Sequence, residues 1–225
     1  MYRKKLLCAI ICLFMLTSCA GLLIGYDARK AFEQGLGLFN QGKYSEAVPL
    51  FQKAAELEPE YTQAYIYLGR SYLNLRQWFE AIPPLRTAYR LSPGETKKEA
   101  INFLLDALIG AALSELKQGN FTSSIGYLRE ALDVEPGSDK AKNELVNTML
   151  AYGGNLLSEG NFSDAITQFT EAIELSPNNL DAYLGLAKAY LNKGDFIDAM
   201  RTINNAMKIA PTEKDRSMFQ ELLKR

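Results

Sequence analysis

One residue pattern occurs five times along the chain and constrains its fold more than any other feature. It reads aromatic residue, two residues, small residue, three residues, bulky apolar residue, two residues, Ala, four residues and Pro. The five copies are Tyr44-Ala47-Phe51-Ala54-Pro59, Trp78-Ala81-Leu85-Ala88-Pro93, Phe121-Ser124-Leu128-Ala131-Pro136, Phe162-Ala165-Phe169-Ala172-Pro177 and Phe196-Ala199-Ile203-Ala206-Pro211. A chain built on such a pattern repeats one small structural unit.

The spacing of the pattern predicts pairs of helices. The small positions lie at residues 47, 81, 124, 165 and 199, which gives steps of 34, 43, 41 and 34 residues. A period of 34 residues is typical of a repeated helix–turn–helix unit. Offsets of three, four and seven residues place the aromatic, small and bulky residues on one face of the second helix. Each Pro ends that helix because it has no backbone N–H. The turn before it is predicted at Gly42, Gly119, Gly160 and Gly194.

A second small residue lies twelve positions before each small position, at Gly35, Gly69, Ala112, Gly153 and Ala187. With this addition, the chain from Ala28 to about Glu213 resembles the tetratricopeptide repeat family. The resemblance implies an all-α fold, a right-handed superhelical α-solenoid of about five helix–turn–helix units plus a C-terminal capping helix. The expected ranges are 28–225 for the solenoid, about 28–61, 62–95, 105–138, 146–179 and 180–213 for the repeats, and 212–224 for the capping helix. Met218, Leu222 and Leu223 are expected to cover the last repeat.

The first residues carry the features of a leader. Three basic residues at 3–5 precede an apolar run from Leu6 to Leu16, which has the length of a signal-peptide core. Leu16-Thr17-Ser18-Cys19 then resembles the lipobox of bacterial lipoproteins, in which the Cys receives lipid. The resemblance implies a signal peptide over 1–18, a lipidated Cys19 and a short tether over 19–27. Ala20 after Cys19 is similar to lipoproteins sorted to the outer membrane of a diderm bacterium, so the repeats would lie in the periplasm.

An uncleaved membrane anchor is the alternative interpretation of the leader. Leu6 to Ile24 is apolar or small almost throughout and is about long enough to cross a bilayer. Both interpretations place the repeats outside the cytoplasm. The three Cys are Cys8, Cys12 and Cys19, so a chain cleaved before Cys19 keeps a single Cys and forms no internal disulfide.

Composition argues against several classes of function. The formal net charge is −1, and loss of a leader that carries Arg3, Lys4 and Lys5 makes the chain more acidic, which disfavours nucleic acid as a partner. The chain has no His, which excludes His-based nucleophilic catalysis and His-ligated metal sites. Acidic pairs such as Glu171 and Glu174 have spacings typical of solvated helix faces. We therefore expect no enzymatic activity, no cofactor and no metal.

Two insertions lengthen the middle of the repeat array. The steps of 43 and 41 residues exceed the basic period by nine and seven, and the extra residues 96–104 and 139–145 contain no Pro or Gly. They are rich in helix formers, so they predict first helices that are longer by about two and a half and two turns. These turns are either tolerated elongation or a ledge for a partner or a second protomer.

The family resemblance also implies where a partner would bind. In this family the first helix of each pair lines a concave surface, and the corresponding positions are Phe32, Leu36, Asn40, Ile66, Arg70, Asn74, Leu184, Lys188 and Asn192. The three Asn residues occupy the same position in their repeats, and their side-chain amides could form hydrogen bonds with a peptide backbone. Alternatively, the apolar members pack between helices and the Asn residues cap helix ends.

These observations predict a membrane-tethered scaffold that binds other envelope proteins or peptides during assembly of bacterial envelope complexes. Resemblance to tetratricopeptide lipoproteins suggests a pilotin-like role, outer-membrane protein assembly or an adaptor for cell-wall hydrolases. The alternative is a structural envelope component that forms homo-oligomers through its extended middle helices.

Overall fold

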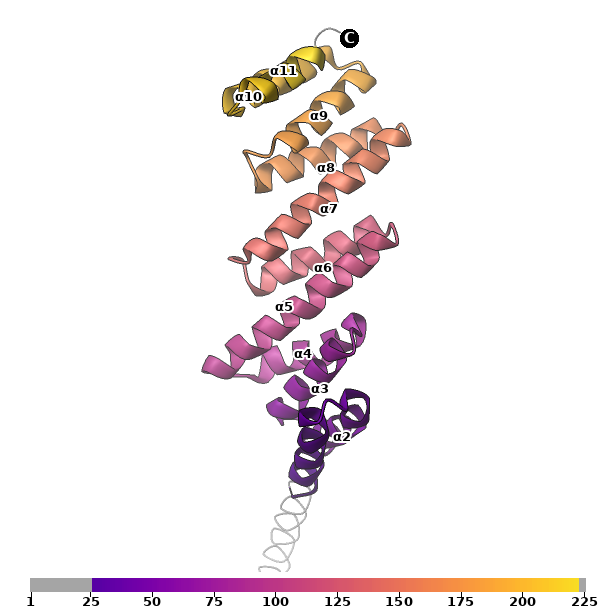
Figure 1. Cartoon of the computed structure of the whole chain (residues 1–225), viewed down its shortest axis with the longest axis vertical. Coiled ribbons are helices and arrows are strands. Elements are labelled where there is room, and N and C mark those ends of the chain that lie inside the picture. The colour runs from indigo at the N-terminus through magenta and orange to yellow at the C-terminus, as the bar shows by residue number, and fades with distance from the viewer. Residues whose placement is uncertain (1–25, 223–225) are drawn as a thin grey trace, which may run out of the picture. The chain divides into compact units, whose positions relative to one another are not determined.

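The computed structural model describes residues 26–222, and every regular element within that range is an α-helix (Figure 1). Residues 26–40 are helical. They are followed by α2 (Tyr44–Leu57), α3 (Thr62–Asn74), α4 (Trp78–Leu91), α5 (Gly94–Lys117), α6 (Phe121–Val134), α7 (Asp139–Ser158), α8 (Phe162–Leu175), α9 (Leu180–Lys193), α10 (Phe196–Ile209) and α11 (Glu213–Leu222). The helices form two compact units, and the boundary between the units follows Gly110 within α5. The all-α repeat fold expected from the sequence is confirmed.

The recurring pattern defines the second helix of each pair. The aromatic residue is the first helical residue in α2, α4, α6, α8 and α10, and each of these helices has 14 residues. In each of them, the backbone N–H that follows the helix donates to the carbonyl of the pattern's last Ala, as from Glu58 to Ala54. Pro follows directly, and because it has no N–H it cannot continue the helix.

The turn between the two helices of a pair needs a left-handed backbone. Gly42, Gly119, Gly160 and Gly194 have φ between 76° and 88°, as the sequence predicted. In the second copy the same position holds Arg76, whose φ is 57°. A side chain in this conformation costs free energy that Gly does not.

Small residues let the helices approach closely. A Cβ added at Gly69 would lie 2.3 Å from Cγ of Leu85, which is the bulky residue of the same repeat. In the second unit the ring of Phe169 lies between Gly153 on α7 and Gly185 on α9, at 2.7 and 2.3 Å from an added Cβ. The bulky side chain therefore fills the space that the small residues leave.

The C-terminal helix covers part of the last repeat. Phe219 of α11 is fully buried against Ala187, Ile203 and Ala206. The predicted residues Met218 and Leu222 are partly buried beside this cluster, whereas Leu223 lies outside the described residues. Sequence reasoning therefore placed the cap correctly but missed Phe219, its buried residue.

The N-terminal part of α10 stays uncovered. Phe196 and Ile197 are 66% and 85% exposed, and Met200 is exposed one turn later. The residues that correspond to Met200 in the second and third copies, Ile82 and Ile125, are buried. Exposure at this position is thus specific to the last repeat of the described chain.

The two insertions lengthen helices, as predicted. Helix α5 has 24 residues and α7 has 20, whereas α3 and α9, the first helices of unmodified repeats, have 13 and 14. The additional turns of α7 lie at its N-terminal end, and they carry Leu145, which is buried.

Gly153→Ala should destabilise the protein, and Gly154→Ala should stabilise it. Both residues lie in α7, but an added Cβ meets Phe169 at Gly153 and nothing within 4 Å at Gly154. Phe169 has little room to move away from Gly153 because its ring atoms Cε1 and Cζ also lie against Gly185. We expect a loss of about 1–3 kcal/mol at Gly153 from overpacking and a gain of up to about 1 kcal/mol at Gly154 from helix propensity. Urea unfolding followed by circular dichroism measures both, and equal midpoints for the two variants would contradict this packing.

Arg76→Gly should raise the unfolding midpoint. The left-handed conformation costs a non-glycine residue roughly 1–2 kcal/mol, and the added flexibility of Gly in the unfolded chain removes roughly half of that gain. Gly42→Ala, at the equivalent turn, is the reciprocal variant and should lower the midpoint. Thermal unfolding of the two variants and wild type tests the pair, and a lower midpoint for Arg76→Gly would refute it.

Candidate functional site

Arg70 lies at the centre of the first-helix face in the first unit. Its guanidinium carbon is 5.1, 4.6 and 5.0 Å from the ring centroids of Phe39, Tyr67 and Phe103. Its Nη1 is 3.8 Å from Oε1 of Glu99 on α5. Arg70 therefore joins the first helices of three successive copies through cation–π contacts and one ion pair. The side chain is 27% exposed, so one edge of the guanidinium still faces solvent.

Aromatic residues surround this position. Phe32 packs against the rings of Phe51, Tyr61 and Tyr67, with centroids 5.0–5.5 Å apart. Burial raises the pKa of the Tyr61 hydroxyl, and nearby Arg29 opposes that shift.

The other predicted groove residues of the first unit differ in exposure. Leu36 is half-buried, and Ile66 is fully buried against Ala88 and Ala100. Asn40 and Asn74 are exposed. Nδ2 of Asn74 donates to the carbonyl of Arg70 at 2.8 Å. This bond gives the carbonyl of Arg70 a side-chain donor from one turn further along α3, and it leaves the side-chain oxygen of Asn74 free to accept from a ligand.

The second unit places its three predicted residues on α9. Leu184 packs against the cluster that contains Phe219. Lys188 and Asn192 are exposed, one helical turn apart. The adjacent Lys193 pairs with Asp195 at 2.9 Å, and that hydrogen bond raises the pKa of the Lys193 ammonium. This edge of α9 is therefore polar, and Lys188 has no ion pair with any residue in the described range.

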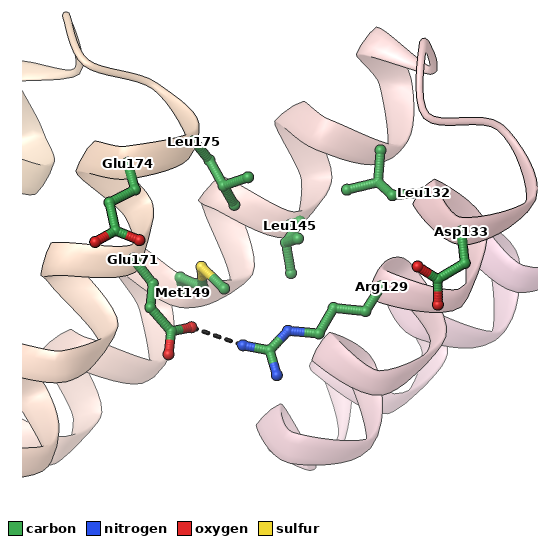
Figure 2. Close-up of a pocket in the computed structure, with 8 residues that line it drawn as sticks. All are labelled: Arg129, Leu132, Asp133, Leu145, Met149, Glu171, Glu174 and Leu175. Carbon is green, nitrogen blue, oxygen red and sulfur yellow. Dashed lines mark hydrogen bonds and ion pairs between the residues drawn. The ribbon is translucent and has the colours of Figure 1, made fainter.

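A cavity of about 560 Å³ lies between three helices of the second unit, where sequence reasoning predicted no site (Figure 2). Helices α6, α7 and α8 contribute the side chains that line it: Arg129, Leu132, Asp133, Leu145, Met149, Glu171, Glu174 and Leu175. Nη2 of Arg129 on α6 is 2.7 Å from Oε2 of Glu171 on α8. This ion pair spans the cavity across the buried side chains of Leu145 and Met149 on α7. One signal was available in the sequence, because Leu145 belongs to the seven-residue insertion.

No group of three His, Cys, Asp or Glu side chains within residues 26–222 could hold a metal ion. No helix in the same range is long and apolar enough to cross a membrane. Cys19, the predicted lipidation site, lies outside the described residues.

Two curated relatives match about half of this chain. The chain is 30% identical over 114 residues to ALBINO3-like protein 3, mitochondrial, of Arabidopsis thaliana, which covers 49% of this chain and 20% of that protein. It is also 30% identical over 115 residues to sperm-associated antigen 1 of Rattus norvegicus, covering 50% of this chain and 12% of that protein. The chain thus spans a fifth or less of these two relatives.

Two models of the tetratricopeptide repeat match the chain, over residues 32–96 and 156–224. A TPR repeats protein from Bacteroides fragilis NCTC 9343 has a similar fold, with a TM-score of 0.65 and 16% identity over 88% of this chain and 98% of that one. The two family matches together span more than half of the sequence, and α2 to α10 follow the repeat helix by helix. The chain therefore belongs to the tetratricopeptide repeat family.

Proposed function

We propose that this protein is a lipid-anchored scaffold of the bacterial cell envelope, which binds segments of other envelope proteins through its first helices. The observation that carries the scaffold function is the tetratricopeptide repeat fold itself, because members of this family generally act as non-catalytic scaffolds. Each of the two units presents first helices whose exposed side chains include amides and cations.

The first-helix faces suit an extended or helical peptide. In the first unit, Asn40 and Asn74 are exposed beside a cluster of aromatic rings and the partly exposed Arg70. In the second unit, Lys188 and Asn192 are exposed on α9. Amides can donate to and accept from a peptide backbone, and the cations can pair with its acidic side chains or carboxylate terminus.

The leader supports the location that we propose. Basic residues, an apolar core and Leu16-Thr17-Ser18-Cys19 occur in the order and spacing of a lipoprotein signal. Lipid on Cys19 would tether the first repeat close to the membrane, and Ala20 favours the periplasmic face of the outer membrane. Among envelope scaffolds, a pilotin-like role, outer-membrane protein assembly and hydrolase recruitment all fit this placement.

Self-association is the second function that we consider. Leu113 on the elongated helix α5 is 42% exposed, and it corresponds to a groove position in the third copy. A second protomer could cover this side chain. Sedimentation of the purified protein over a wide range of concentrations separates the two functions, since a constant monomer mass rules out self-association.

Replacing Arg70, Asn74 and Lys188 by Ala should weaken capture of partners in crosslinked cells. Three lost hydrogen bonds or ion pairs at about 1 kcal/mol each reduce affinity by roughly a hundredfold. A second variant, Asn40→Ala with Lys188→Ala and Asn192→Ala, leaves the Arg70 contacts intact and separates binding from folding. The matched control changes Arg90, Asn204 and Lys208, which are exposed on second helices. Unchanged capture by both test variants would refute groove binding.

Cys19→Ser should abolish the acylated N-terminal peptide that mass spectrometry detects in the wild-type protein. The physical reason is that Ser has no thiol to carry the lipid, and lipid chains are what tether a processed lipoprotein without a spanning helix. A wild-type protein that retains Met1 and carries no lipid on Cys19 would instead support the uncleaved anchor over Leu6 to Ile24.

A further inference from the structure

The cavity between α6, α7 and α8 combines an apolar floor with an acidic rim. Leu145 and Met149 form the middle of the floor, and Leu132 and Leu175 flank them from α6 and α8. The floor depends on the additional turns of α7, because Leu145 lies within them. An apolar side chain of a partner could enter this volume together with parts of its neighbours, since a cavity of about 560 Å³ exceeds the size of any one residue.

The charges of the rim do not cancel within the protein. Arg129 pairs with Glu171, which leaves Asp133 on α6 and Glu174 on α8. Neither of these two carboxylates has an ion pair or hydrogen bond with another residue in the described part of the chain. Figure 2 shows them on opposite sides of the floor. The rim therefore presents one unpaired negative charge on each side of an apolar centre.

The two carboxylates lie where they destabilise the helices that carry them. Asp133 and Glu174 lie in the last turns of α6 and α8, and neither last turn contains a basic residue. The C-terminal end of a helix has a partial negative charge, so it favours cations and disfavours carboxylates. The C-terminal ends of α6 and α8 both lie beside this cavity. The electrostatic potential in the cavity is therefore negative, because the backbone carbonyls and the carboxylates both contribute to it.

We propose that this cavity binds a basic peptide segment of a partner protein, in which an apolar side chain is flanked by Lys or Arg. The apolar side chain occupies the floor over Leu145 and Met149. The flanking cations pair with Asp133 and Glu174, and they also interact favourably with the C-terminal ends of α6 and α8. The second helices α6 and α8 supply the charged rim and the first helix α7 supplies the floor, and none of the lining residues is a predicted groove residue, so the site does not depend on the groove residues of the proposed scaffold function.

The test uses a fluorescent hexapeptide with two central Leu residues, each flanked by Lys, and the purified full chain in a non-ionic detergent. Empty micelles serve as the blank. Two matched peptides replace Lys by Glu or Leu by Ser. Fluorescence anisotropy should show binding of the Lys–Leu peptide alone, and binding should weaken as salt rises from about 50 to 300 mM because the pairs are partly exposed. Equal binding of the Glu peptide or the Ser peptide would overturn the proposal.

The variant Asp133→Asn with Glu174→Gln should lower the affinity for the Lys–Leu peptide by about tenfold or more, because both charge pairs are lost. Its unfolding midpoint should be unchanged or higher, since the substitution removes two unfavourable charges from helix C-termini. The control, Glu56→Gln with Glu58→Gln, changes two carboxylates at the end of α2 and should retain wild-type affinity. Equal affinity in the test variant, or an equal loss in the control, would show that the cavity is not the site.

Discussion

Close approach between a small residue and a bulky one is the interaction on which every repeat depends. Gly69 and Leu85 meet at a distance that leaves no room for a methyl group. In the second unit, Phe169 is held by Gly153 from its own repeat and by Gly185 from the next. One ring thus fixes the spacing within a pair of helices and between pairs. Because the same contact recurs in both units, consecutive helices within each unit pack against one another in sequence order.

The sequence predicted most of this architecture because the pattern consists of residues with direct physical roles. Each aromatic residue begins a second helix, and each Pro follows the end of one. Gly at the turn was predicted from its freedom to adopt a positive φ. The two elongated helices were predicted as well, since insertions without Pro or Gly in good helix formers extend a helix more readily than they form a loop.

The candidate sites were harder to predict because they depend on contacts between repeats. Arg70 was identified as a groove residue. Its contact with Phe103 was not predicted, because Phe103 lies within the nine-residue insertion and has no counterpart in the regular repeat. Asp133 and Glu174 each resemble ordinary solvated residues within their own helices. Only the packing of α6 and α8 on either side of the longer α7 brings them to one cavity. Phe219 was missed for a similar reason, because the face that α11 buries depends on how it packs against α9 and α10.

The exposed start of α10 bears on how such an array could grow. Trp78 contacts Gly110, and Phe121 stacks on Tyr152, so in these copies the first helix of the following repeat covers the leading aromatic residue. Phe196 has no such cover, although Ile203 and Ala206 further along α10 are already buried by the cap. If a sixth helical hairpin were added by design, its first helix would bury Phe196 and Ile197 where it packs against α10. The exposed start of α10 is therefore a surface on which a further repeat could pack.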